Sequence, residues 1–165
     1  MQKFSILWVS VLVLFAGGCA QKQYSISEPK LITIKSPKLK FSDMGYVRHE
    51  GDAVEVELFA AGMAVEKITI DQEVCVQSGC MSEAKFTKEY LYELYPPDTM
   101  RRILLRQDIF GGKGKEELCN GTLYQFIRDE EMDIMYGRKP NETYFKDRLN
   151  GLIIRISDMN ATVGQ

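Results

Sequence analysis

The chain has 165 residues, of which 45% are hydrophobic and 27% charged, with 13 glycines and 5 prolines. These proportions exclude a disordered, collagen-like or polytopic membrane protein and fit one globular domain. A formal net charge of -2 gives no basic footprint for nucleic acid, and a single histidine excludes a multi-histidine metal site, so we expect no nucleic-acid partner, no metal and no cofactor.

The N-terminal segment has the composition of a secretory signal. Lys3 precedes an apolar run over residues 4–15, which is too short to cross a ~30 Å hydrocarbon layer as a helix. Small residues and then Cys19 follow this run. This ending resembles the bacterial lipobox, in which the cysteine thiol receives diacylglycerol, the signal is cut before the cysteine, and the new amino group takes a fatty acid such as palmitate. The alternative is an ordinary secretory signal with an incidental cysteine.

Lipidation at Cys19 sets the predicted domain organisation. We expect a signal peptide over 1–18, a lipidated N-terminus and tether over 19–30, one globular domain over 31–160 and a C-terminal tail over 161–165. A triacylated cysteine stays on a membrane, because two or more acyl chains anchor stably. Ala20 resembles the sorting signal for the outer membrane. The predicted location is therefore the periplasmic side of the outer membrane, with the inner membrane or the cell surface as alternatives.

Period-two alternation predicts antiparallel strands in the first half of the domain. Residues 32–34 and 39–41 place apolar side chains on one face. Residues 54–58 alternate valine and leucine with glutamate, and residues 65–70 resume the alternation after Gly62, so these two segments predict a hairpin.

A short strand over residues 74–76 leads into a loop that contains two cysteines. Cys75 and Cys80 are separated by a segment with a glycine, which favours a local disulfide. Free buried thiols, or a redox or metal role, are the alternatives, and Cys119 remains as an odd thiol.

The middle of the chain predicts two short helices. Thr87 is a suitable N-cap for a helix that continues to about Leu94 and ends before Pro96. Asp98 is a suitable cap for a second helix, whose apolar residues recur at helical spacing: Met100, Ile103 and Leu104.

The remaining residues predict three further strands, over 123–127, 132–136 and 152–156, with turns at 129–130 and at Asn150-Gly151. Strands, two helices and then strands indicate an α+β fold, with a curled antiparallel sheet over the central helices. At the C-terminus, Asn160 lies in an N-x-[ST] match with Asp158 two residues before it, which resembles the acceptor of some bacterial oligosaccharyltransferases; a chance match is the alternative.

No constellation in the chain predicts catalysis. His49 lies in a polar segment over residues 47–51 that we expect to be an exposed turn, and no nucleophile or oxyanion hole adjoins it. We therefore expect a protein that is not an enzyme.

The order of elements resembles LolB, the outer-membrane receptor that accepts lipoproteins from the carrier LolA. The resemblance rests on residues 54–70, on residues 93–105 with their Pro-Pro turn, and on residues 123–159. It implies an unclosed half-barrel whose helices cover an acyl-chain cavity. The predicted interior residues are Val54, Val56, Leu58, Ile68, Ile70, Met100, Ile103, Leu104, Ile154 and Ile156.

The resemblance also implies a membrane- or cargo-facing loop. LolB presents an exposed leucine there, where this chain has Ala61, and Met63 is the nearest large apolar residue. Arg106 stands where the family usually has glycine. The expected function is a membrane-anchored lipoprotein that binds an acyl chain or another apolar ligand, with a lipoprotein carrier as a candidate partner. The alternative is an envelope scaffold or interaction lipoprotein with a filled core.

Overall fold

The computed structural model describes residues 28–118 and 120–159. The predicted signal peptide, the acylation of Cys19, most of the tether, Cys119, Asn160 and the tail over 161–165 lie outside these residues.

Within the described ranges, the chain forms one eleven-stranded sheet, two α-helices and one turn of 3-10 helix, η1. In chain order the elements are β1 (Glu28–Lys35), β2 (Lys40–Glu50), β3 (Ala53–Ala60), β4 (Met63–Ile70), β5 (Val74–Val76), β6 (Gly79–Met81), α1 (Glu83–Tyr90), α2 (Thr99–Leu104), η1 (Phe110–Gly112), β7 (Lys115–Glu117), β8 (Leu123–Arg128), β9 (Asp133–Lys139), β10 (Glu142–Asp147) and β11 (Leu152–Asp158).

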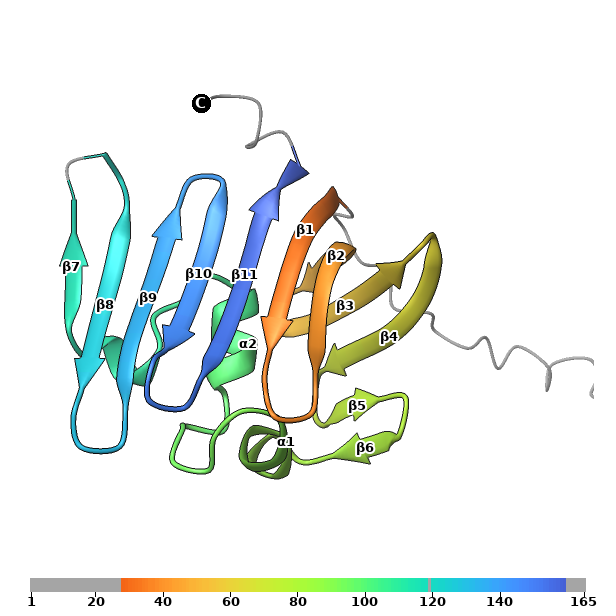
Figure 1. The fold of residues 1–165 in the computed structure, drawn as a ribbon, viewed down its shortest axis with the longest axis horizontal. Coiled ribbons are helices and arrows are strands. Elements are labelled where there is room, and N and C mark those ends of the chain that lie inside the picture. The colour runs from red at the N-terminus through yellow and green to blue at the C-terminus, as the bar shows by residue number, and fades with distance from the viewer. Residues whose placement is uncertain (1–27, 119, 160–165) are drawn as a thin grey trace, which may run out of the picture.

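The sheet consists of two meanders that meet at their ends. Strands β1 to β6 form the first meander and β7 to β11 the second, and β1 pairs with β11, which gives the order β6-β5-β4-β3-β2-β1-β11-β10-β9-β8-β7. All neighbours are antiparallel. The sheet is open, with β6 and β7 at its edges. Figure 1 shows β3 and β4 turning away from the plane of the other strands, with α2 behind the sheet and α1 below the β1–β2 hairpin.

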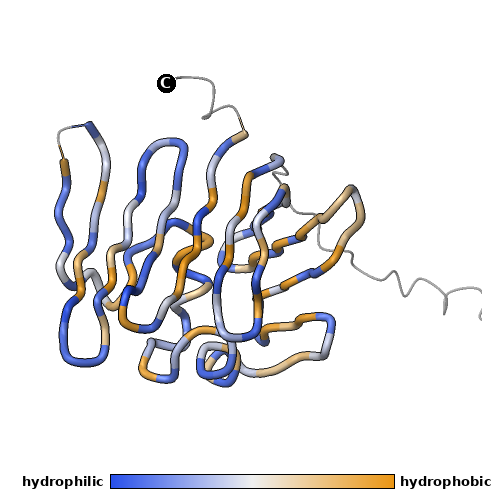
Figure 2. Tube along the Cα trace, viewed as in Figure 1, coloured by the Kyte–Doolittle hydropathy of each residue, from blue (hydrophilic) through white to orange (hydrophobic). Residues whose placement is uncertain are grey.

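The core lies between the curled sheet and the helices. It is built from alternate residues of the long strands, such as Ile32 and Ile34 on β1, and from the apolar side of α2. In Figure 2 the tips of the β8–β9 and β9–β10 hairpins are hydrophilic, whereas hydrophobic segments alternate with hydrophilic ones along the strands. The structure therefore confirms the coarse prediction of an α+β fold with an unclosed, curled antiparallel sheet over two short helices.

Several strand predictions were wrong, and the short strands β6 and β7 were not predicted. Strand β1 begins at Glu28, so residues 28–30 belong to the sheet and not to the tether. His49 is exposed as predicted, yet it lies in β2, opposite Val54, and the turn follows at Gly51. Strand β10 was missed, because its inward positions are Thr143, Phe145 and Asp147 and therefore show little apolar alternation.

Gly45 allows β2 to approach both of its neighbouring strands, β1 and β3, closely. A Cβ atom at this residue would lie 2.7 Å from Cδ1 of Ile32 on β1 and 2.7 Å from the carbonyl oxygen of Glu57 on β3. No other residue type fits this approach without displacing one of the flanking strands.

A side-chain cap marks the start of α1 but not that of α2. The predicted start of the first helix was wrong: the backbone N–H of Lys85 donates to Oγ of Ser82, so α1 begins at Glu83 and Thr87 lies inside it. The buried Thr87 hydroxyl instead donates to the Pro97 carbonyl oxygen at 2.7 Å. Asp98 precedes α2 as predicted, but its carboxylate pairs with Arg102 and makes no capping hydrogen bond.

Candidate functional site

The ten predicted interior residues lie on the inner face of the sheet and on α2. Nine of them are buried, with exposures of 0–6%, and belong to the hydrophobic core; Ile156 is half-buried and packs against it. The interior below the helices is thus filled with side chains. Toward one end of the sheet, a cavity lies beside two of these residues, Leu104 and Ile156.

This cavity of about 210 Å³ lies between the end of α2 and strands β1, β2, β10 and β11. We call it the rim cavity, because β1 begins and β11 ends beside it. Its apolar lining comes from Val47, Leu104, Leu105 and Ile156. The volume exceeds the ~150 Å³ of an apolar cavity that accepts benzene, so it has room for part of an acyl chain.

Polar side chains surround the rim cavity: Lys30, His49, Arg106, Thr143 and Asp158. Lys30 Nζ and Asp158 Oδ1 lie 2.7 Å apart in an ion pair that joins β1 to β11. An apolar lining with a polar margin is the usual composition of a site for an amphiphilic ligand.

Arg106 closes one side of this margin. Its φ of 56° lies in the left-handed region that favours glycine, the residue that the resemblance to LolB places there. The guanidinium donates to the carbonyl oxygens of Lys139 and Pro140 in the β9–β10 turn. These contacts hold the end of α2 against the sheet.

The β3–β4 hairpin presents the predicted apolar loop. Ala61 and Gly62 form a two-residue turn with φ values of 51° and 80°, which is the left-handed geometry of a tight hairpin. Met63 is 69% exposed and Val65 is 41% exposed. In Figure 2 this tip is pale orange, on the hydrophobic side of the colour scale, whereas the tips of β8–β9 and β9–β10 are blue.

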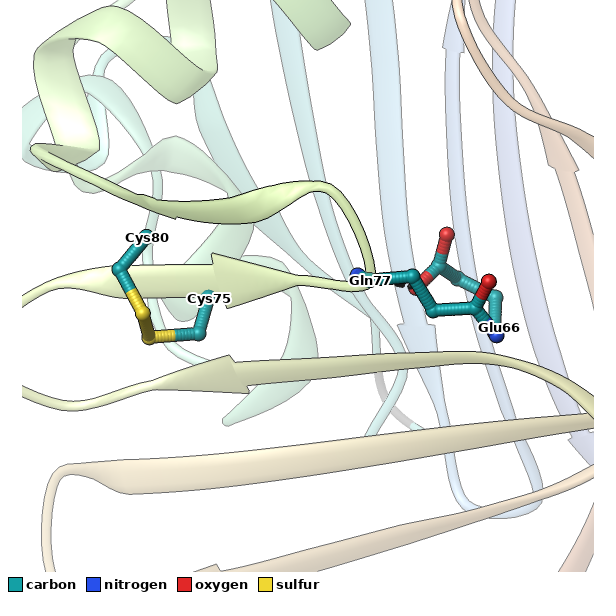
Figure 3. Close-up of a disulfide and its surroundings, with 4 residues drawn as sticks. All are labelled: Glu66, Cys75, Gln77 and Cys80. Atoms are coloured by element: carbon teal, nitrogen blue, oxygen red, sulfur yellow. Dashed lines mark hydrogen bonds between the residues drawn. A yellow bond between two sulfur atoms is a disulfide. The ribbon is translucent and has the colours of Figure 1, made fainter.

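A disulfide hairpin supports this apolar tip. The Sγ atoms of Cys75 and Cys80 lie 2.02 Å apart, which confirms the predicted pairing across β5 and β6. At the turn of this hairpin, the backbone N–H of Gln77 donates to Oε1 of Glu66 at 3.0 Å, and its side-chain amide donates to the Val65 carbonyl oxygen at 2.9 Å (Figure 3). The Gln77 contacts were not predictable from local patterns, because they join residues eleven and twelve positions apart in the chain.

Two further polar clusters were missed by the sequence reasoning, and both are structural. Asp147 is fully buried and accepts a hydrogen bond from the Tyr95 hydroxyl at 2.5 Å. Arg101 on α2 donates to Glu83 at the start of α1 and to the carbonyl oxygens of Asp52 and Asp71. Every partner lies on a different loop or helix, so local patterns did not indicate these contacts.

Residues 28–118 and 120–159 hold no group of three or more histidine, cysteine, aspartate or glutamate side chains placed to bind a metal ion. Neither α1 nor α2 has the length and apolar character that a membrane-spanning helix needs.

Comparison of the chain with protein-family models, with curated proteins and with solved structures finds no match.

Proposed function

We propose that this protein is a membrane-anchored periplasmic lipoprotein that binds an acyl chain, or a similar apolar ligand, at the rim cavity. The observation that carries the proposal is an apolar lining with a polar margin at the end of the sheet where β1 begins. Acylation of Cys19 would place the outer membrane at that end, since residues 19–27 connect directly to β1.

The proposed activity requires no chemical step. Binding would come from burial of CH₂ groups at ~0.8 kcal/mol each, and transfer from a difference in affinity between two sites. The open curled sheet, the two covering helices and the left-handed Arg106 support the LolB-like form of this proposal, in which an outer-membrane lipoprotein takes acyl chains from a carrier.

Ligand binding is tested with two isoleucines on opposite faces of β11. Ile156 is half-buried and lines the rim cavity, whereas Ile153 is half-buried on the outer face. In a chain carrying Cys19→Ala, Ile156→Glu should weaken binding of dansylated undecanoic acid at least about tenfold, because a carboxylate beside the acyl chain costs more than ~1.4 kcal/mol.

Ile153→Glu is the matched control and should bind the fluorescent fatty acid as the parent chain does. Equal losses in the two variants, with unchanged circular dichroism, would place binding elsewhere. A parent chain that takes up no fatty acid and carries no lipid in native mass spectrometry would reject the proposal.

Membrane contact by the β3–β4 tip gives a separate prediction. Met63→Glu should lower partition of the Cys19→Ala chain onto vesicles at least about tenfold, because inserting a methionine contributes roughly 1.5–3 kcal/mol. Met63→Leu should retain partition, and neither change should alter the free energy of unfolding by more than about 0.5 kcal/mol, since Met63 is exposed. Loss of folding in Met63→Glu, measured by urea titration, would assign Met63 to the core instead.

The second candidate is an interaction lipoprotein without a ligand. The observation in its favour is the packing of the interior, since nine of the ten predicted cavity residues are buried in one continuous core. This candidate would be favoured if native mass spectrometry shows the protein without bound lipid and if added fatty acid leaves the free energy of unfolding unchanged.

A further inference from the structure

The outer face of the sheet carries a row of side chains that the proposed function does not use. Strand register places these residues directly opposite one another across β2, β1, β11, β10, β9 and β8. We call them the outer row; in order they are Lys40, Lys35, Ile153, Lys146, Met135 and Phe126. Neighbouring strands are ~4.8 Å apart, so the row extends over roughly 24 Å.

Three lysines in the outer row are unpaired. Across the described part of the chain, Lys35, Lys40 and Lys146 have no carboxylate within ion-pair distance, although most other lysines there do. Lys35 lies directly opposite Lys40, and like charges in such a pair repel and destabilise a sheet. The chain has a net charge of -2, yet it concentrates positive charge in the outer row, where these lysines form no ion pair that would stabilise the fold.

The surface beside the lysines is hollowed. One hollow of about 280 Å³ is lined by Lys35, Lys146, Asp147, Arg148, Gly151 and Ile153. A second hollow, of about 270 Å³, meets the first at Arg148 and is lined by Phe126 and Met135. Asp133 also lines it and pairs with both Arg128 and Arg148. Phe126 is 45% exposed. The first hollow combines cations with an apolar floor, and the second is mainly apolar.

The outer row faces away from the rim cavity. On β1, Lys30 lines the cavity and Lys35 ends the strand, and on β10, Thr143 lines the cavity while Lys146 points to the opposite face. Anchoring through Cys19 would place the membrane at the cavity end, so the occupant of the outer row comes from the aqueous side.

We propose that the outer row binds an acidic segment of a partner protein, about seven residues long and extended across the strands. A length of roughly 24 Å corresponds to seven residues at ~3.4 Å each. Carboxylates of the segment pair with the three lysines, and its apolar side chains occupy the hollows beside Ile153 and Phe126. The repulsion between Lys35 and Lys40 is relieved on binding.

The test uses the purified full-length protein and a fluorescein-labelled peptide that alternates glutamate with leucine. Fluorescence anisotropy should show binding that weakens as salt is raised, and no binding of the same peptide with lysine in place of each glutamate. Lys35→Glu combined with Lys146→Glu should weaken binding at least tenfold. The thermal midpoint should not fall, because Lys35→Glu replaces the repulsive pair with Lys40 by an attractive one.

Lys113→Glu is the matched control, since Lys113 is an exposed lysine without an ion pair in the described ranges and lies outside the outer row. It should bind the peptide within twofold of the parent protein. Equal losses in Lys113→Glu and in the double variant would overturn the proposal, as would absence of binding at low salt. Binding to phosphatidylglycerol vesicles that the peptide does not compete with, and that the double variant loses, would assign the row to a membrane instead. Because Ile156→Glu leaves the outer row intact, failure of the acyl-chain proposal leaves this result unaffected.

Discussion

Replacement of Asp147 by asparagine is expected to lower the free energy of unfolding by about 3 kcal/mol. Asp147 is fully buried, and its Oδ2 accepts from the Tyr95 hydroxyl at 2.5 Å and from the Asn150 side-chain amide at 2.8 Å. Its Oδ1 accepts from the backbone N–H groups of Asp133, Leu149 and Asn150. An asparagine has one acceptor oxygen, so its amide would face N–H or O–H donors that then lack a partner. Urea titration measures the loss.

The same variant should be less sensitive to acid. Burial raises the pKa of Asp147, but hydrogen bonds from Asn150, Tyr95 and backbone N–H groups outweigh burial and hold it below the ordinary value. The ionised carboxylate therefore stabilises the fold above its unfolded pKa of about 3.9, and this contribution is lost as pH falls through the lower folded pKa. Between pH 7 and pH 3 the parent protein should lose more stability than Asp147→Asn.

Tyr95→Phe provides the matched control for this cluster. It removes one hydrogen bond to Asp147 and keeps the carboxylate, so it should cost about 1 kcal/mol and retain most of the acid dependence. Identical acid dependence in the parent protein and in Asp147→Asn would show that Asp147 does not contribute in this way.

Replacement of Arg101 by methionine is expected to lower the free energy of unfolding by about 2–3 kcal/mol. The reason is that the Arg101 side chain connects four elements of the structure. The guanidinium donates to Glu83 of α1 through Nε at 2.7 Å, to the Asp52 carbonyl oxygen in the β2–β3 turn at 2.6 Å, and to the Asp71 carbonyl oxygen after β4. The side chain is only 16% exposed, so the carboxylate of Glu83 would lose its cation in a partly desolvated place.

Arg102→Met is the control for Arg101. Arg102 is the next residue of α2, its side chain is 39% exposed and it pairs with Asp98 of the preceding turn. Such an exposed pair contributes about 0–1 kcal/mol, so this variant should unfold at nearly the parent urea concentration. A cost for Arg102→Met as large as that for Arg101→Met would contradict the bridging role of Arg101.

The secondary structure was predictable where one face of an element is uniformly apolar. The hairpin of β3 and β4 follows from the valine, leucine and isoleucine alternation of residues 54–58 and 68–70, and α2 follows from Met100, Ile103 and Leu104. Prediction was wrong for β10 and for the start of α1. Strand β10 turns Thr143 and Asp147 inward. There the Asp147 carboxylate accepts a hydrogen bond from the hydroxyl of Tyr95, which lies in the segment after α1. Helix α1 begins at Glu83, and its N-cap, Ser82, lies five residues before the expected cap at Thr87.

The candidate site was predictable only in part. The apolar tip at Met63 and the Cys75–Cys80 disulfide follow from residues that are neighbours in the chain. The rim cavity was not indicated as such, because it joins Val47 of β2, Leu105 after α2 and Ile156 of β11, which come together only when β1 pairs with β11. The outer row was missed for the same reason, because only the strand register places its members side by side: Lys35, Ile153 and Lys146.

The amino-acid sequence by itself determined the class of this protein: alternating strands around two short helices, a local disulfide and an exposed apolar hairpin tip. Each depends on side chains within about a dozen residues of one another, so periodicity and turn chemistry suffice to predict it. Tertiary structure decided which interior residues fill the core and which border a cavity, and it aligned three lysines on the outer face. Those outcomes depend on the pairing of β1 with β11, a contact between the two ends of the described chain whose register local patterns do not encode.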